Sequence, residues 1–138
     1  MAHWLLKSEP SSWSWDDQVK AGAKGTEWNG VRNHLAKKHL MAMKKGEQAF
    51  FYHSVDEKSI VGIVEIIGEY RPDPTDKMKK FGLVDVRATK PLPTPVTLEI
   101  CKTEKKLAKM VLLNNSRLSV QPVTDAEWDI ICRMGGLK

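Results

Sequence analysis

The sequence has little cysteine and lacks the residue spacings that are typical of a metal site. Its two cysteines, Cys101 and Cys132, form no CxxC pair, so we expect two reduced, partly buried thiols. Four histidines are scattered along the chain without an HExxH motif: His3, His34, His39 and His53. The sequence therefore predicts neither a metal site nor a cofactor.

Long hydrophobic runs are also missing. No segment approaches the ~20 apolar residues that cross a bilayer. The first residues lack the charged start, the apolar stretch and the small-residue cleavage site of a signal peptide. We therefore expect an intracellular protein without a membrane partner, cytoplasmic in a bacterium and nuclear in a eukaryote.

The chain has no internal repeat, no low-complexity segment and no break in composition. Its 138 residues match the length of one ordinary domain, and a content of 41% hydrophobic and 28% charged residues is typical of globular proteins. A chain of this size buries about two thirds of its unfolded surface and needs no disulfide. We expect a single domain over residues 1–138.

Positive charge and tryptophan are abundant. The net charge is +5, the isoelectric point is about 9.2, and there are five tryptophans. A positive balance favours nucleic acid or another polyanion as the partner, although many basic proteins bind neither.

Runs of apolar, β-branched and aromatic residues predict the strands. "HWLL" is a short first strand that ends before Pro10, and residues 48–54 and 59–70 form a hairpin around the polar loop "VDEK". Further extended segments are expected at 83–90, 91–96 and 117–123.

Capping signals predict the helices. Ser14 with Asp17 and Thr124 with Glu127 have capping-box spacing, and Thr97 precedes a helical pattern over 97–110. Another helix follows the turn at Asn29-Gly30 and ends near Gly46. These elements predict an α+β fold with a small, highly curved sheet or partly closed barrel.

Lys7, Ser8 and Glu9 end the first strand with an ammonium donor, a hydroxyl and a carboxylate. At a strand end these side chains can fan into a cleft and contact the edge of a polar ring. The alternative is a solvated strand end in which Ser8 or Glu9 caps the next turn. From these residues alone the alternative is favoured.

"EWNGVRN" places a tryptophan just before a turn and a helix. Trp28 can form one wall of a slot, and stacking a base on it contributes roughly 1–3 kcal/mol. The amides of Gly30 and Val31 are donors at the helix start, Arg32 is a candidate phosphate contact, and Asn33 is a candidate base contact. Alternatively, Trp28 packs on the helix and Asn33 is exposed.

Two more polar groups lie near predicted strands. Tyr52, His53 and Ser54 end the second strand, and we expect them to line the same cleft as the first group. Arg117 and Ser119 are two positions apart and share one face of a short strand, which is how a strand presents them to a pocket.

Four segments in register resemble the EVE domain family, a branch of the PUA-like superfamily. They are "WLLKSEP", "WNGVRNHLA", "FFYHS" followed by "IVGIVEI", and "RLSVQPV" followed by "EW". The resemblance covers nearly the whole chain and implies a strongly curved mixed β-sheet or pseudo-barrel flanked by helices. EVE domains are similar to YTH domains, which read methylated adenine in RNA, so the resemblance also implies recognition of a modified base.

The resemblance assigns the pocket to named residues. These are Lys7, Ser8, Glu9, Trp28, Asn29, Gly30, Val31, Arg32, Asn33, Tyr52, His53, Ser54, Arg117 and Ser119. Many members read "RNxxARN", whereas this chain reads "RNHLAKK", so Lys37 and Lys38 replace Arg and Asn. The charge at the first of these positions is kept and the asparagine is lost.

Residues and resemblance lead to one hypothesis, a non-catalytic domain that binds modified DNA or RNA. A flipped or unpaired base enters a slot walled by Trp28, with Tyr52 as the candidate opposite wall. Its edge contacts Ser8, Glu9 and Asn33, while Lys7, Arg32 and Arg117 neutralise phosphate.

Two alternatives stay open. One is a small nuclease or base-modifying hydrolase that uses His53 with Glu9 or Lys7, although the sequence has no GxSxG nucleophile elbow. The other is a protein-interaction module that uses the basic surface and no pocket.

Overall fold

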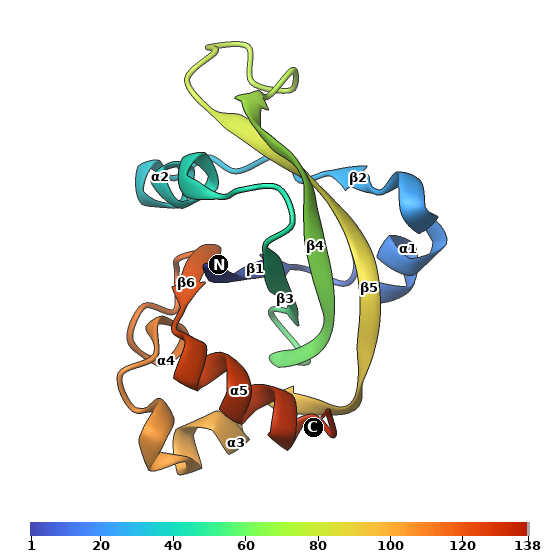
Figure 1. Ribbon diagram of the computed structural model, residues 1–138. Coiled ribbons are helices and arrows are strands. Elements are labelled where there is room, and N and C mark those ends of the chain that lie inside the picture. The colour runs from blue at the N-terminus through green and yellow to red at the C-terminus, as the bar shows by residue number, and fades with distance from the viewer. Residues whose placement is uncertain (138) are drawn as a thin grey trace.

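The computed structural model describes residues 1–137 and contains a six-stranded mixed sheet (Figure 1). The strands are β1 (His3–Ser8), β2 (Thr26–Glu27), β3 (Gln48–His53), β4 (Ser59–Pro72), β5 (Gly82–Thr97) and β6 (Val120–Val123). Their order in the sheet is β2-β5-β4-β3-β1-β6. β1 and β3 are parallel, and the other neighbours are antiparallel. The predicted hairpin of β3 and β4 is confirmed.

β4 and β5 give the sheet its curvature. They have 14 and 16 residues, and their pairing register shifts at four points. Each shift bends and twists a strand pair. The two strands run from the β4–β5 loop (residues 73–81), at the top of Figure 1, to the helices at the bottom. The predicted α+β class with a curved sheet flanked by helices is confirmed.

Five α-helices and two short 3₁₀ turns complete the described part of the chain. The helices are α1 (Trp15–Lys20), α2 (His34–Ala42), α3 (Leu98–Thr103), α4 (Val111–Asn114) and α5 (Asp125–Met134), and the turns are Gly22–Lys24 and Lys105–Leu107. Both predicted capping boxes are present, at the start of α1 and of α5. The Thr97 hydroxyl accepts a hydrogen bond from the Ile100 amide and caps α3.

Three predicted elements have different bounds. α2 starts only at His34, because the Asn33 side chain caps it. The helix predicted over 97–110 breaks at Glu104, whose backbone is extended and whose side chain accepts from the Lys106 amide. The strand predicted over 117–123 begins at Val120, because Gln121 Nε2 donates to two carbonyls of the preceding turn and holds it in place. Arg117 and Ser119 therefore lie in a turn.

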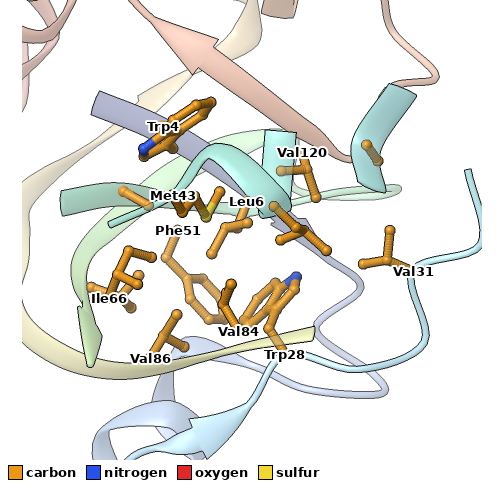
Figure 2. Packing of buried hydrophobic residues seen from close by; sticks show 14 of the residues in the cluster. Trp4, Leu6, Trp28, Val31, Met43, Phe51, Ile66, Val84, Val86 and Val120 are labelled. Carbon is orange, nitrogen blue, oxygen red and sulfur yellow. The ribbon is translucent and has the colours of Figure 1, made fainter. Parts of the chain in front are cut away.

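Each face of the sheet packs on its own hydrophobic cluster. Leu6 and Phe51 belong to the cluster that includes α1 and α2 residues, and Figure 2 shows Trp28 beside Phe51 within it. Leu5 and Phe50, their neighbours in sequence, belong to the cluster that includes α3, α4 and α5. Because side chains alternate along a strand, successive residues at the ends of β1 and β3 face opposite sides of the sheet.

Candidate functional site

A cleft of about 400 Å³ lies between the end of β1, the turn that follows it and β2. Its lining combines two indole rings with three hydroxyls, a carboxylate and an amide. The lining residues are Ser8, Ser12, Trp13, Thr26, Glu27, Trp28 and Asn29. Flat aromatic surface beside short polar groups suits a planar ring with a polar edge.

Trp13 is held in position by hydrogen bonds. Its Nε1 donates to Oε1 of Gln18 at 2.8 Å, and Gln18 is fully buried. The Ser8 hydroxyl donates to the Trp13 carbonyl, and the Trp13 amide donates to the Glu9 carbonyl at 2.9 Å. The half-buried indole is thus oriented before any ligand arrives.

Trp28 is positioned mainly by packing. Only 7% of the residue is exposed, and its ring meets Phe51 edge-on, with centroids 5.5 Å apart. Its amide donates to the Val84 carbonyl at 2.8 Å. Trp28 therefore belongs to the core and to the cleft wall at once, so both interpretations of this residue apply.

Arg71 bridges two carboxylates at the rim of the cleft. The Glu27 carboxylate contacts Arg71, which also contacts Asp85. The hydrogen bond that Arg71 donates to Asp85 and the charge of Asp85, together with Glu27, raise the pKa of the Arg71 guanidinium despite some burial. Arg71 thus offsets one of the two negative charges beside the cleft.

His53 is the last residue of β3, and both nitrogens of its ring form hydrogen bonds. Nε2 is 2.9 Å from the Trp15 amide, which can only donate, so Nε2 accepts and the ring proton sits on Nδ1. Nδ1 then donates to the Glu57 carboxylate at 2.8 Å. Neither Glu9 nor Lys7 is its partner, so this geometry does not favour the predicted nuclease or hydrolase.

Lys7, Tyr52 and Ser54 line a second cleft of about 160 Å³, together with residues near α3 and α4. Lys7 Nζ donates to the Ser116 carbonyl at 2.8 Å and lies 5.7 Å from the Tyr52 ring centroid. Burial lowers the pKa of Lys7 and, with the nearby Cys101, raises the pKa of Tyr52 to about 12. The prediction that Tyr52 faces Trp28 across one slot is wrong, because the two residues belong to different clusters.

The residues after Trp28 mostly serve the β4–β5 loop. The Gly30 amide donates to Asp73 Oδ2 at 2.9 Å, and Arg32 Nη1 donates to the same oxygen at 3.1 Å. Asn33 Oδ1 accepts from the Ala36 amide and caps α2, and the role of Asn33 as a base contact stays a prediction. Val31 is buried, while Asn29 remains in the cleft.

The remaining predicted residues lie outside both clefts. Glu9 and Arg117 are exposed, and Ser119 contributes its carbonyl to the Lys7 amide at 2.9 Å. The structure thus joins Ser8, Trp28 and Asn29 in the larger cleft and separates them from the other candidates.

Four lining residues were not among the predicted ones: Ser12, Trp13, Thr26 and Glu27. A local signal for Trp13 exists, because "SSWSW" puts a tryptophan next to the Ser14 cap of α1. That placement matches Trp28, which also precedes a helix. Thr26 and Glu27 give no such signal, since only their pairing with β5 brings them to the cleft.

Neither a metal-binding cluster nor a membrane-spanning helix is found within the described residues. Within residues 1–137, no cluster of three or more His, Cys, Asp or Glu side chains is arranged to hold a metal ion. The helices of this part of the chain are all too short or too polar to span a membrane.

The EVE domain model matches residues 2–134. The chain belongs to the EVE domain family. It is 37% identical to thymocyte nuclear protein 1 of Gallus gallus and 35% identical to that of Homo sapiens. Each match covers 94% of this chain and, respectively, 66% and 72% of the relative, so the chain spans about two thirds of the length of these proteins.

Solved structures of similar proteins extend the comparison. Rpa0253 from Rhodopseudomonas palustris is 60% identical with a TM-score of 0.93, over 99% of this chain and 94% of that one. Human THYN1, solved in complex with DNA containing 5-methylcytosine, is 32% identical with a TM-score of 0.90, over 100% and 99% of the chains. A Zygosaccharomyces rouxii YTH domain, solved with N6-methyladenosine RNA, shares the fold at 16% identity and a TM-score of 0.58, over 97% and 86%.

Proposed function

We propose that this protein binds a modified base of DNA or RNA, and that the base enters the cleft between Trp13 and Trp28. The observation that carries the proposal is the cleft itself, in which two indoles stand beside the hydroxyl of Ser8 and the amide of Asn29. A flat heterocycle fits the indole surfaces, and its edge can bond to the polar groups. The human relative that was solved with 5-methylcytosine DNA supports this ligand class.

The expected energies favour a domain that discriminates only modestly between modified and unmodified bases. Stacking on an aromatic ring contributes roughly 1–3 kcal/mol per base. Flipping a base costs a few kcal/mol, and less where the base is unpaired. One methyl group in an apolar corner adds only about 1–3 kcal/mol. Tight binding therefore needs further contacts outside the cleft.

The sharpest test uses Trp13 rather than Trp28, because loss of Trp28 would also disturb the core. Fluorescence anisotropy would measure binding to labelled DNA duplexes and single strands that differ only by one 5-methylcytosine. Trp13→Ala should weaken binding at least fivefold, which corresponds to about 1 kcal/mol of stacking free energy.

Trp13→Phe is the matched control. It keeps an aromatic face, although a smaller one, and loses the hydrogen bond to Gln18, so it should retain more affinity than Trp13→Ala. The proposal fails if Trp13→Ala binds both DNAs as wild type does while remaining folded. A panel of other modified bases in RNA and DNA would then decide between a different ligand and a protein-interaction role.

A further inference from the structure

Five lysines lie on α2 and on the β4–β5 loop, whose last residue, Phe81, packs against the start of α2. They are Lys37 and Lys38 of α2 and Lys77, Lys79 and Lys80 of the β4–β5 loop, and all except the half-buried Lys37 are exposed. We call this surface the lysine face. The loop sequence "DPTDKMKK" mixes charges of both signs, so its net effect depends on where the carboxylates point.

Both aspartates of the loop point inward. Asp73 is 2% exposed and accepts hydrogen bonds from Thr75, the Gly30 amide and Arg32. Asp76 is 8% exposed and accepts from the amides of Met78, Lys80 and Phe81 at 2.7–3.0 Å. The negative charges thus shape the loop from within and are largely withdrawn from its surface, which is left to the lysines.

Phe81 joins the loop to α2. Its ring centroid lies 6.0 Å from the Lys37 ammonium, 6.0 Å from the Arg32 guanidinium and 5.0 Å from the His34 ring. These contacts seat the first turn of α2 on the end of the loop. Lys37 of α2 therefore lies beside the base of the loop that carries Lys77, Lys79 and Lys80.

The loop that carries three of these lysines is also tied to the cleft wall. Gly30, whose amide is bound to Asp73, directly follows the cleft residue Asn29. Asp73 therefore fixes the loop to the segment that forms one wall of the cleft. A polymer that placed one unit in the cleft would carry its neighbouring units past this segment.

We infer that the lysine face binds the phosphate backbone beside the base that occupies the cleft. This inference rests on the proposed function, and it assigns the affinity to a surface distinct from the base site. Binding to phosphate is insensitive to sequence and to base modification, and its salt dependence falls with each phosphate that the protein no longer neutralises.

The test is a triple substitution, Lys77→Gln, Lys79→Gln and Lys80→Gln, measured with the same methylated and plain duplexes at several salt concentrations. Affinity for both duplexes should fall about tenfold or more at low salt. The slope of log affinity against log salt should become shallower by about 0.9 for each phosphate that is no longer neutralised. The ratio of affinities for the two duplexes should stay unchanged.

Two controls isolate the effect. Lys102→Gln, Lys105→Gln and Lys106→Gln together remove three exposed lysines at the α3 end, which lies at the opposite end of the molecule (Figure 1). Met78→Ala changes the loop, where this residue is 71% exposed, without changing its charge. Both variants should keep the wild-type salt slope.

The outcomes separate the two proposals. If the loop triple variant and the α3 triple variant lower the salt slope equally, binding depends on net charge alone. The proposal that the lysine face binds phosphate is then refuted. If the loop variant leaves slope and affinity unchanged while Trp13→Ala still weakens binding, the face is refuted and the proposed function stands. If wild type prefers no modified base but the loop variant loses affinity, the phosphate surface stands and base recognition fails.

Discussion

The two tryptophans of the cleft are held by different forces. Trp13 depends on a hydrogen bond to the buried amide of Gln18, whereas Trp28 depends on edge-on packing against Phe51. The Trp13 ring is half-buried and keeps surface that can contact a ligand, whereas packing covers most of the Trp28 ring. Substitution of Trp28 removes a large buried side chain, whereas substitution of Trp13 removes a half-buried ring and the donor to Gln18 Oε1, so the stability of each variant is measured beside its binding.

His53 has a structural role, and we predict that its loss lowers the stability of the fold. His53→Ala removes the acceptor of the buried Trp15 amide, and an unpaired buried donor costs about 1–3 kcal/mol. The substitution also removes the edge-on packing of the His53 ring against Phe51, which adds to this cost. Urea denaturation should therefore show a reduced free energy of unfolding.

Glu57→Ala provides the comparison. It removes only the half-exposed partner of Nδ1, so it should cost less than about 1 kcal/mol. A nuclease assay on the same proteins tests the alternative function. Cleavage by wild type that disappears in a fully stable His53→Ala variant would contradict the structural role.

Elements with a local signal could be predicted from the sequence, and those shaped by distant contacts could not. The caps Ser14, Thr97 and Thr124 act within three residues of their own backbone targets, which is why the helix starts were predictable. Thr26 and Glu27, by contrast, reach the cleft through β-sheet contact with Val86 and Asp85, which lie far along the chain. No spacing rule encodes that contact.

The contact at Gly62 shows how closely α1 packs against β4. An ideal Cβ on this β4 glycine would lie 2.4 Å from the Trp15 ring, so α1 rests directly on the strand backbone. We predict that Gly62→Ala costs about 1–3 kcal/mol, which is typical of overpacking. Thermal unfolding of Gly62→Ala, of Trp15→Leu and of the double variant would measure this loss of stability.

The double variant serves as the control for that measurement. Trp15→Leu shortens the side chain that blocks the new methyl group, so the two costs should sum to more than the double variant shows. Additive costs would mean that the strand bends away and that the contact does not limit the packing.

At the scale of the molecule, the sheet divides what the sequence brings together. Lys7 and Ser8 are neighbours, yet alternation sends one into the smaller cleft and the other into the larger. The sequence predicted the curved α+β fold and three of the larger cleft's residues, Ser8, Trp28 and Asn29. The grouping of all candidates into one pocket could not be checked without knowing which face of the sheet each one occupies.

Asp73 links the β4–β5 loop to the start of α2, and its ionisation should make the stability of the molecule depend on acid pH. Burial opposes the charge, but hydrogen bonds from Thr75 and Gly30 and from Arg32 outweigh it and lower the pKa of Asp73 to about 2. An unfolded aspartate has a pKa of about 3.9, so the ionised form favours folding by about 2–3 kcal/mol. This contribution is complete above about pH 4 and is lost as the pH falls towards about 2.

We therefore predict that Asp73→Asn lowers the free energy of unfolding at neutral pH and flattens its decline below about pH 4. Other carboxylates with a lowered pKa, such as Asp76 and Glu47, are common to both proteins, so the difference between the two curves isolates Asp73. Asp56→Asn, at an exposed position, controls for the loss of one negative charge. Parallel curves for Asp73→Asn and wild type in urea titrations from neutral pH to about pH 2 would mean that this carboxylate does not hold the loop to α2.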